Sequence, residues 1–512
     1  MLARINCSVV SGVDACFVEV EVDISYGLPA FNIVGLPEIA VRESRERVKA
    51  AVKNSGYTFP PDRITVNLAP ADIRKEGTGF DLPVAMGILA ASKVVSADLC
   101  SRYSMVGELS LDGRVKSVPG VVAAALSAKE KGLQGILVPR ANGQEASVVQ
   151  GVEVLPVESL SQAVNFFSGF ENIVPLTCDL NVILDEIHGP GEVDFCHVMG
   201  QSHVKRALEI AATGGHNLMM TGSPGSGKSM MAKRLPSILP GLTYEEAMET
   251  TRIYSAAGLL RESMPFVTTR PFRSPHHTVS AAGLVGGGLR PQPGEVTLAH
   301  NGLLFLDELP EFRRNVLEVL RQPMEDGRVT ISRAGNQLSY PAEFMLVAAM
   351  NPCPCGYSGD SHRECSCTHA QIQRYRSRIS GPLLDRIDLH IDVPAVPFRE
   401  LSQNVVPESS AVIRERVEAA RQIQLHRFSG KKNFCNAAMG SRQIKSCCTL
   451  GDKASRLLET AITHLGFSAR AYSRILKIAR TIADLEPSRS IGEQHVAEAI
   501  QYRTLDRKNG FL

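Results

Sequence analysis

The sequence contains no tryptophan, and only 5% of its 512 residues are aromatic. Any platform on which nucleic-acid bases stack would therefore have to use Phe, Tyr or the planar side chain of Arg. The chain also lacks an excess of one charge, because 55 Lys and Arg face 53 Asp and Glu, a net charge of +2. This balance excludes a uniformly basic protein, although it leaves room for local basic segments.

Long apolar runs are missing as well. The longest, residues 84–91, is about half of what a membrane crossing needs, and Asp81 and Lys93 flank it. Residues 1–5 alternate like a β-strand and lack the charged head and apolar run of a signal peptide. We therefore expect no membrane span, no export and a cytoplasmic protein. In that reducing compartment the 12 cysteines are expected to be core residues or metal ligands.

Length and pattern predict several domains, because a chain of 512 residues is too long for one hydrophobic core. Residues 1–170 mix alternating strands with an amphipathic helix, which is typical of an α+β domain. A polar stretch at 171–194 is predicted to be a linker. Residues 195–397 alternate buried strands with helices, which predicts an α/β domain with a largely parallel sheet. Residues 398–512 are predicted to be helical.

The strongest motif is a phosphate-binding loop that follows an apolar strand at 217–221 and precedes a predicted helix. Such loops bind ATP, because glycines let backbone N–H groups wrap the phosphates at a helix N-terminus. Lys228 is expected to reach the β and γ phosphates, and the Ser229 hydroxyl to ligate Mg²⁺. The loop consists of Gly222, Ser223, Pro224, Gly225, Ser226, Gly227, Lys228 and Ser229.

Polar residues also follow two later apolar strands. Residues 303–306 end at Asp307 and Glu308, which fit a ligand for Mg²⁺ and a group that acts on the attacking water. With the phosphate-binding loop, this pair predicts ATP hydrolysis. Asn351 follows a third apolar strand and could hold the water that attacks the γ-phosphate. A turn-forming Asn before Pro352 is the alternative.

Three arginines are further catalytic candidates. Arg386 lies among apolar residues and would be either an arginine finger or the partner of Asp385 or Asp388 in a salt bridge. Arg470 and Arg474 share the polar side of a predicted helix, a stripe that could face phosphate.

One loop, residues 353–367, concentrates cysteines. Four thiolates are the number that a closed tetrahedral Zn²⁺ site needs, although the Cys-x-Cys spacing is less usual than Cys-x-x-Cys. His362 and His369 are substitute ligands, and free thiols are the alternative interpretation. We predict structural zinc, because four close cysteines in a cytosolic chain rarely occur together without cause. The predicted ligands are Cys353, Cys355, Cys365 and Cys367.

Charge is distributed unevenly along the chain. Residues 412–480 hold 14 Lys and Arg against 4 Asp and Glu, a local balance of +10. Solvated helix faces explain isolated charges, whereas so one-sided an excess is the footprint expected for the phosphate backbone of a nucleic acid. Contacts of this kind do not depend on base sequence.

Two segments of the predicted ATPase domain suit loops that line the pore of a ring. Residues 328–338 have strand, turn, strand character and would present Arg328 and Arg333 to DNA. Residues 272–288 contain three consecutive glycines and are the second candidate for such a loop. An ordinary flexible Gly-rich loop is the alternative interpretation of this segment. Their candidates for DNA contact are Arg273, His276 and His277.

Over essentially its whole length the chain resembles the ComM/YifB family of magnesium-chelatase-like AAA+ ATPases. The resemblance implies an AAA+ core with a helix-2 insert and a C-terminal helical lid of the magnesium chelatase type. It also implies Asn351 as sensor 1, Arg386 as a finger that acts in trans, and Arg470, or failing that Arg474, as sensor 2. A finger that acts in trans needs a neighbouring subunit, so a hexameric ring is expected. The resemblance rests on residues 222–229, 271–278, 306–312, 351–356, 381–386 and 479–486.

Residues 1–170 are similar to the domain that Lon proteases share with RadA-type recombination ATPases, notably at 107–115. Lon chemistry needs a Ser nucleophile and a Lys base. No Ser stands in the expected place around 75–82, and the base position falls on Val122. We therefore predict a domain for binding or ring assembly without a protease dyad.

The resemblance implies a helicase that migrates DNA branches on single-stranded and branched double-stranded DNA. Its role would be to integrate incoming DNA during natural transformation and homologous recombination, with a recombinase as a candidate partner. A remodelling ATPase that acts on protein or on a metal-chelatase partner is the alternative. A binding module with a vestigial ATPase is disfavoured, because Lys228, Asp307 and Glu308 are all intact.

Overall fold

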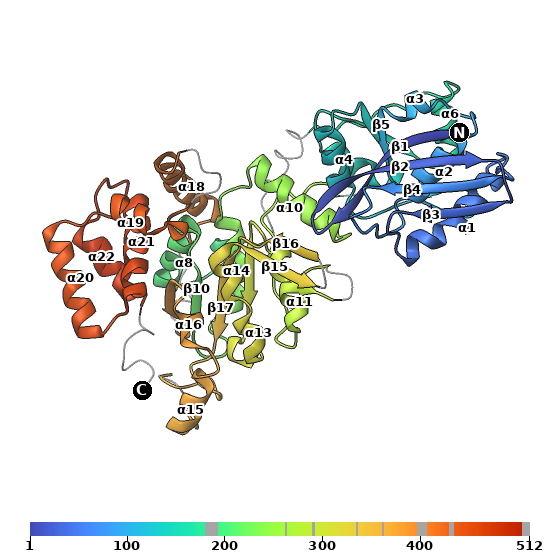
Figure 1. Ribbon diagram of the computed structural model, residues 1–512. Helices are drawn as coiled ribbons and strands as arrows, with labels where there is room; N and C mark the ends of the chain where they lie inside the picture. The colour runs from blue at the N-terminus through green and yellow to red at the C-terminus, as the bar shows by residue number, and fades with distance from the viewer. Residues whose placement is uncertain are drawn as a thin grey trace. The chain divides into compact units, whose positions relative to one another are not determined.

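The computed structural model describes residues 1–179, 193–261, 264–288, 292–333, 336–360, 363–396, 407–429 and 435–503. The side chains of 332, 333 and 336 lie outside this description. The chain divides into two compact units, one made of Met1–His188 and Ala247–Thr268, the other of Gly189–Glu246 and Thr269–Leu512. Figure 1 shows the helices and strands of each unit.

The first unit is a mixed α/β structure with a sheet in the order β3-β4-β2-β1-β5-β8-β9. Strands β1, β2 and β4 pair antiparallel, and the other neighbours pair in parallel. The strands are β1 (Leu2–Ser11), β2 (Asp14–Ser25), β3 (Ala30–Val34), β4 (Arg63–Ala69), β5 (Tyr103–Met105), β8 (Gly135–Pro139) and β9 (Glu153–Val157), with a short hairpin of β6 (Glu108–Leu109) and β7 (Val115–Lys116). The helices are α1 (Ile39–Asn54), α2 (Asp81–Ala91), α3 (Ala97–Cys100), α4 (Val121–Glu130), α5 (Gly143–Ser147) and α6 (Leu160–Phe167).

The apolar run noted in the sequence forms α2, in which every residue is buried. Gly87 brings this helix close to β2, since a Cβ there would lie 2.6 Å from Val22 Cγ2. Asp81, in the first turn, pairs with Arg47 of α1 at 2.7 Å. Burial raises the pKa of Asp81 to about 6, although Arg47 opposes the shift. Among the described helices, none is both long and apolar enough to cross a bilayer.

Helix α10 (Tyr244–Ala256) begins in the second unit and continues into the first. The Ser255 carbonyl accepts the N–H of Gly120 at 2.9 Å, and Arg252 pairs with Asp14 at 2.9 Å. The sequence pattern placed all of 195–397 in the ATPase domain. In the structure, 247–268 group with the N-terminal residues because these contacts bind them there.

The second unit contains a five-stranded sheet in which every described pairing is parallel, in the order β11-β14-β17-β10-β18. The strands are β10 (Leu218–Thr221), β11 (Phe272–Arg273), β14 (Leu303–Leu306), β17 (Met345–Met350) and β18 (Leu389–Asp392). Two hairpins stand outside the sheet, β12 (Gly286–Gly287) with β13 (Gln292–Pro293) and β15 (Arg328–Arg333) with β16 (Asn336–Pro341). The helices of this part are α8 (Ser202–Gly214), α9 (Lys228–Arg234), α11 (Ala281–Val285), α12 (Glu295–Leu298), α13 (Arg314–Glu318), α14 (Arg321–Asp326), α15 (His369–Arg376) and α16 (Gly381–Leu384).

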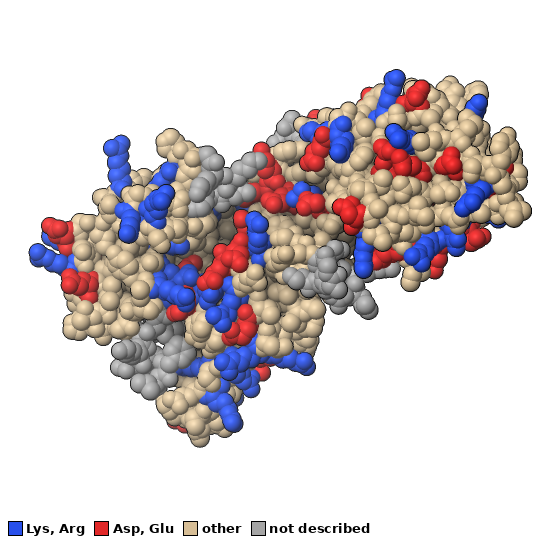
Figure 2. Space-filling view, viewed as in Figure 1, with Lys and Arg blue, Asp and Glu red and all other residues tan. Residues whose placement is uncertain are grey.

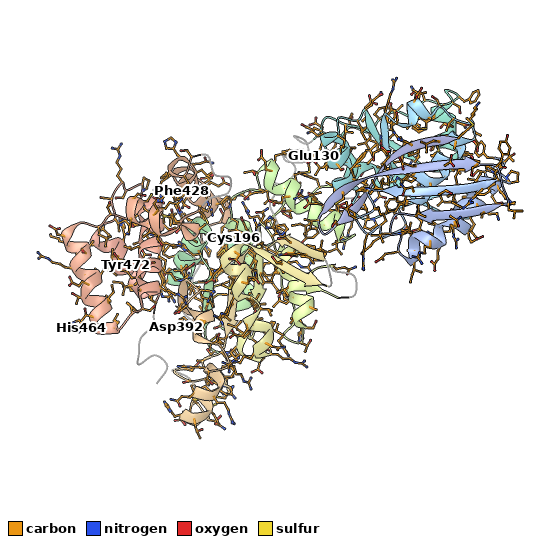
Figure 3. All side chains as sticks on the ribbon, viewed as in Figure 1. Glu130, Cys196, Asp392, Phe428, His464 and Tyr472 are labelled. Carbon is orange, nitrogen blue, oxygen red and sulfur yellow. The ribbon has the colours of Figure 1, made fainter. Side chains whose placement is uncertain are left out.

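After β18 the described chain is helical, so the predicted parallel sheet and helical C-terminus are confirmed. Figure 3 labels His464 on α20 and Tyr472 on α21. The helices are α18 (Ser410–Arg427), α19 (Ser441–Cys447), α20 (Asp452–Leu465), α21 (Ala469–Leu485) and α22 (Glu493–Gln501).

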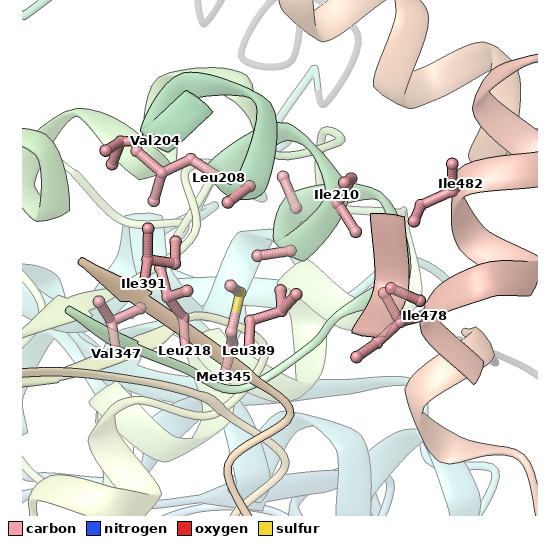
Figure 4. Packing of buried hydrophobic residues seen from close by; sticks show 14 of the residues in the cluster. Val204, Leu208, Ile210, Leu218, Met345, Val347, Leu389, Ile391, Ile478 and Ile482 are labelled. Atoms are coloured by element: carbon pink, nitrogen blue, oxygen red, sulfur yellow. The ribbon is translucent and has the colours of Figure 1, made fainter. Parts of the chain in front are cut away.

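One apolar core joins this helical part to the sheet (Figure 4). Leu208 of α8 packs over the sheet residues Leu218 and Leu389, and Ile478 and Ile482 of α21 enter the same cluster. Each of these side chains is fully buried, which stabilises the fold by about 1.5–3 kcal/mol per side chain. The C-terminal helices, predicted to form a lid, are therefore fixed to one face of the five-stranded sheet.

A buried ionic network stabilises the lid itself. Asp484 accepts hydrogen bonds from Arg427 at 2.8 Å, from Arg480 at 3.0 Å and from Asn436 at 2.8 Å. Asp484 is buried, so its charge depends on these donors rather than on water.

We predict that Asp484→Ala destabilises the lid by about 3–5 kcal/mol, because the buried guanidinium of Arg480 and the part-buried one of Arg427 would lose their counter-ion. Scanning calorimetry of the full chain would show this as a lower melting temperature for the transition of the second unit. Glu459→Ala is the control, since Glu459 is exposed on α20. Equal melting temperatures for the two variants would contradict the structural role of the network.

Candidate nucleotide site

The carboxyl ends of three neighbouring strands bring the predicted ATP residues together. Strand β10 leads into Gly222, β14 into Asp307 and β17 into Asn351. Thr221 pairs with Met350, and Leu306 with Ala348, so the three strands end at the same edge of the sheet. Parallel α/β sheets bind ligands at this edge.

The phosphate-binding loop has the backbone that its glycines require. Gly225 and Gly227 have φ of +79° and +93°, a region that residues with a Cβ rarely adopt. Gly222 touches the neighbouring strand, since a Cβ there would lie 2.2 Å from the Val393 carbonyl oxygen. Helix α9 begins at Lys228, so its free N–H groups face the loop, as phosphate binding requires.

Lys228 lies inside the loop and is only 8% exposed. Its ammonium donates to the carbonyls of Gly222 at 2.7 Å and Ser223 at 2.9 Å, and lies 3.3 Å from Asn351 Oδ1. Burial lowers the pKa of Lys228, while the charges of Asp307 and Glu308 oppose that shift. The structure thus places the predicted lysine and the predicted sensor asparagine in contact.

Ser229 and Asp307 also meet, with 2.6 Å between Oγ and Oδ2. A hydroxyl and a carboxylate are oxygen ligands of the kind that Mg²⁺ prefers. Glu308 adopts a φ of +51°, and its side chain is 57% exposed. Its N–H donates to Asp307 Oδ1 at 2.9 Å, so Asp307 contacts Ser229 through its other oxygen, whereas the Glu308 carboxylate lies near His277. That arrangement suits one ligand for the ion and one group for the water.

The histidines predicted to contact DNA lie close to this site. His277 Nδ1 is 3.9 Å from Glu308 Oε2, and the ring of His276 lies 4.0 Å from that of His277. The reason is topological, because β11 pairs in parallel with β14 and both strands end at the same edge. Arg273 pairs with Glu295 at 2.7 Å. DNA contacts by these residues stay a prediction.

The predicted pore hairpin is present as β15 and β16, which pair antiparallel. Arg328 is exposed at its base. Arg333 belongs to β15, but its side chain lies outside the described residues. A role for either residue in binding DNA stays a prediction.

Arg386 lies at the opposite edge of the sheet from the phosphate-binding loop. Its carbonyl accepts the side-chain N–H of Asn217, and Asn217 directly precedes β10. The buried guanidinium donates to Pro382 at 2.6 Å and pairs with Glu325. It lines a cleft of about 600 Å³, and no residue of 222–229 is among the described residues that line this cleft.

The two candidate sensor 2 arginines lie near the same amino edge. Arg474 pairs with Asp388, and Arg470 lies 3.4 Å from Asp385. Asp388 accepts the backbone N–H of Asn217 at 3.1 Å. Although burial opposes it, the charges of Arg474 and neighbouring groups hold the pKa of Asp388 below its usual range. The two arginines expected to face phosphate are thus paired with aspartates that lie within two residues of Arg386 in the sequence.

The four predicted zinc ligands come together. Cys353, Cys355, Cys365 and Cys367 place their sulfurs within 4.8 Å of one another. His369 begins α15, and His362 lies outside the described residues. The cluster follows β17 directly and so adjoins Asn351.

Sequence reasoning missed Gln201. Its side-chain amide donates to the carbonyls of Ser226 at 3.0 Å and Pro394 at 2.8 Å, which ties the start of α8 to the phosphate-binding loop. His203 contacts the carbonyl of Asp392 at 3.0 Å. Asp392, which Figure 3 labels, is the last residue of β18. In the sequence, these contacts are signalled only by the polar character of Gln201 and His203, which lie at the start of α8.

Comparison with known proteins agrees with this geometry. Residues 194–401 match the family described as magnesium chelatase, subunit ChlI, and residues 407–503 match its C-terminal family. Residues 20–142 match a family described as subunit ChlI of Mg-chelatase. YifB of Escherichia coli (strain K12) is 44% identical over 510 residues, which cover 99% of this chain and 98% of YifB. The chain belongs to the ComM/YifB family.

The chain is also similar to two further proteins. The competence protein ComM of Haemophilus influenzae is 46% identical over 500 residues, or 97% of this chain and 96% of ComM. The DNA replication licensing factor mcm6 of Dictyostelium discoideum is 24% identical over 312 residues, or 59% of this chain and 30% of mcm6. As a ComM/YifB protein with an AAA+ ATPase domain of the magnesium chelatase type, the chain has ATP and Mg²⁺ as its implied cofactors.

We predict that Glu308→Gln lowers the ATP turnover number by about 100-fold or more, because the amide cannot accept a proton from water. ATP binding should be retained, since Lys228 and the phosphate-binding loop are unchanged. Steady-state phosphate release and binding of a fluorescent ATP analogue would measure the two quantities. Normal turnover in this variant would remove Glu308 from its assigned role.

Proposed function

We propose that this ComM/YifB protein is an ATP-driven motor that assembles as a hexameric ring and moves on DNA. The observation that carries the proposal is the separation of the two predicted catalytic groups within one chain. Lys228, Ser229, Asp307 and Asn351 stand at the carboxyl edge of the sheet, and Arg386 stands at the amino edge.

The length of β10, which separates Arg386 from the phosphate-binding loop, supports the proposal that Arg386 acts on the nucleotide of a neighbouring subunit. Its four residues span roughly 13 Å at 3.3 Å per residue, and Arg386 reaches back over α16 rather than along the strand. An arginine that contacts a γ-phosphate from this position would do so in the next subunit of a ring. Arg470 and Arg474 lie near the same edge and would face the same neighbouring site.

Two lines support DNA as the substrate. The relatives ComM and mcm6 are named for competence and for DNA replication. Figure 2 shows Lys and Arg side chains gathered over α13 and α15, where Arg314 and Arg374 are exposed. Positive charge of this kind binds phosphate without reading base sequence. Branch migration on single-stranded and branched DNA, with integration of incoming DNA in transformation and recombination, is the activity that we infer.

One observation favours a second function. Three segments of the chain match families described for a magnesium chelatase subunit, so remodelling of a protein or chelatase-type partner is the alternative. The cluster of four cysteines in residues 353–367 is compatible with both the DNA motor and the remodelling ATPase.

We predict that single-stranded and branched DNA raise the rate of ATP hydrolysis by the full-length protein. The stimulation should weaken as salt rises, because the binding releases counter-ions from the phosphates. Phosphate release would be measured with each DNA and without DNA. A rate that neither DNA changes would favour the remodelling function.

We also predict that Lys228→Ala and Arg386→Ala are each inactive alone and partly active when mixed. Loss of an arginine finger costs about 10³–10⁵ in turnover. A mixed ring contains interfaces at which one subunit supplies Lys228 and its neighbour supplies Arg386. Absence of recovery in mixed rings, with ring assembly checked by light scattering, would contradict catalysis in trans.

A further inference from the structure

The cysteine loop between β17 and α15 has the geometry of a mononuclear metal site. Cys353 Sγ lies 3.3 Å from Cys355 Sγ and 3.6 Å from Cys365 Sγ. A disulfide needs about 2.05 Å, and all four cysteines are free. Four thiolates at about 2.3 Å from one tetrahedral Zn²⁺ lie about 3.8 Å apart. The observed spacing therefore leaves room for one ion.

Backbone N–H groups point at two of the four sulfurs. The N–H of Ser358 donates to Cys353 Sγ at 3.3 Å, and the N–H of Cys367 donates to Cys365 Sγ at 3.4 Å. Hydrogen bonds of this kind orient the ligands of a metal site. Several thiolates so close together repel one another unless a cation lies between them. An all-sulfur set selects Zn²⁺ over Mg²⁺ or Ca²⁺, which prefer oxygen.

The same loop touches two parts of the nucleotide site. It starts immediately after Asn351, whose side chain lies 3.3 Å from Lys228 Nζ. Gly356 has a φ of +89°, and a Cβ there would lie 2.5 Å from Pro224 Cδ. The backbone of the cysteine loop thus packs directly on the phosphate-binding loop, at a distance that only glycine allows.

Helix α15 begins just after the last cysteine and returns to the start of the loop. Its Arg376 donates to the Pro352 carbonyl at 3.2 Å. Burial raises the pKa of the neighbouring Tyr375 to about 12, while the backbone of Asn351 acts to lower it, so Tyr375 stands close to Asn351. Both ends of the cysteine loop are therefore anchored beside Asn351.

We propose that Cys353, Cys355, Cys365 and Cys367 bind one Zn²⁺, and that this ion positions Asn351 and the phosphate-binding loop for ATP turnover. The proposal rests on the proposed ATPase and deepens it, because it makes turnover depend on a second metal site outside the nucleotide. Without the ion, the segment that packs on Pro224 loses the crosslink that joins its two halves.

The test begins with the zinc content of the full-length protein, measured by plasma mass spectrometry after dialysis. The expected result is about one zinc per chain. The double variant Cys365→Ser/Cys367→Ser should lose the zinc, and its ATP turnover without DNA should fall by on the order of 10-fold or more, because misplacing a catalytic group by about 1 Å costs that much. Cys447→Ser is the matched control, since Cys447 lies outside the cluster, and it should keep both zinc and turnover.

A second variant separates zinc binding from folding. Gly356→Ala keeps all four thiols but forces a methyl group against Pro224. It should retain zinc and an unchanged circular dichroism spectrum, and still turn ATP over more slowly. A wild-type protein without zinc, or a zinc-free variant with full turnover, would overturn the proposal.

The two readouts, zinc content and turnover without DNA, do not depend on the DNA substrate. A protein that binds zinc and hydrolyses ATP but ignores DNA would contradict the proposed motor and leave the zinc site supported. If DNA stimulates turnover, and turnover survives the loss of zinc, the proposed motor would be supported and the proposed role of the zinc site contradicted.

Discussion

The parallel pairing of β10, β14 and β17 is the constraint on which the nucleotide site depends. Parallel strands end at a common edge, so residues that are far apart in the sequence come within hydrogen-bond distance there. Lys228 contacts Asn351, and Ser229 contacts Asp307, for this reason. The buried apolar side chains of the strands hold the pairing in place, because a one-residue slip would move each of them from the apolar cluster on one face of the sheet to that on the other.

The same sheet also separates the nucleotide site from Arg386, which the sequence predicts to be catalytic. Arg386 and Asp388 follow α16 and stand at the amino edge, beside Asn217. The lid contributes Arg474 to that edge through its pairing with Asp388. Since the lid shares an apolar core with α8 and the sheet, the packing of the lid fixes where Arg474 stands relative to Asp388.

Around the nucleotide site, contacts from short connecting segments fix the position of the phosphate-binding loop, which the sheet alone does not do. Gln201 ties α8 to the phosphate-binding loop, and Gly356 packs the cysteine loop on Pro224. His277 lies 3.9 Å from Glu308, so the segment predicted to meet DNA adjoins the carboxylate predicted to act on the attacking water.

The sequence by itself predicted the strands, the phosphate-binding loop, Asp307, Glu308 and the cysteine loop. Apolar runs and short motifs are local, so neighbouring residues suffice to identify them. Only the tertiary structure decided which strands are neighbours. It also decided three features that no local sequence pattern could predict. His277 lies beside Glu308, Arg386 and Arg474 lie at the edge away from their own loop, and residues 247–268 group with the N-terminal unit. Each outcome depends on contacts between distant segments, which packing of the whole chain determines.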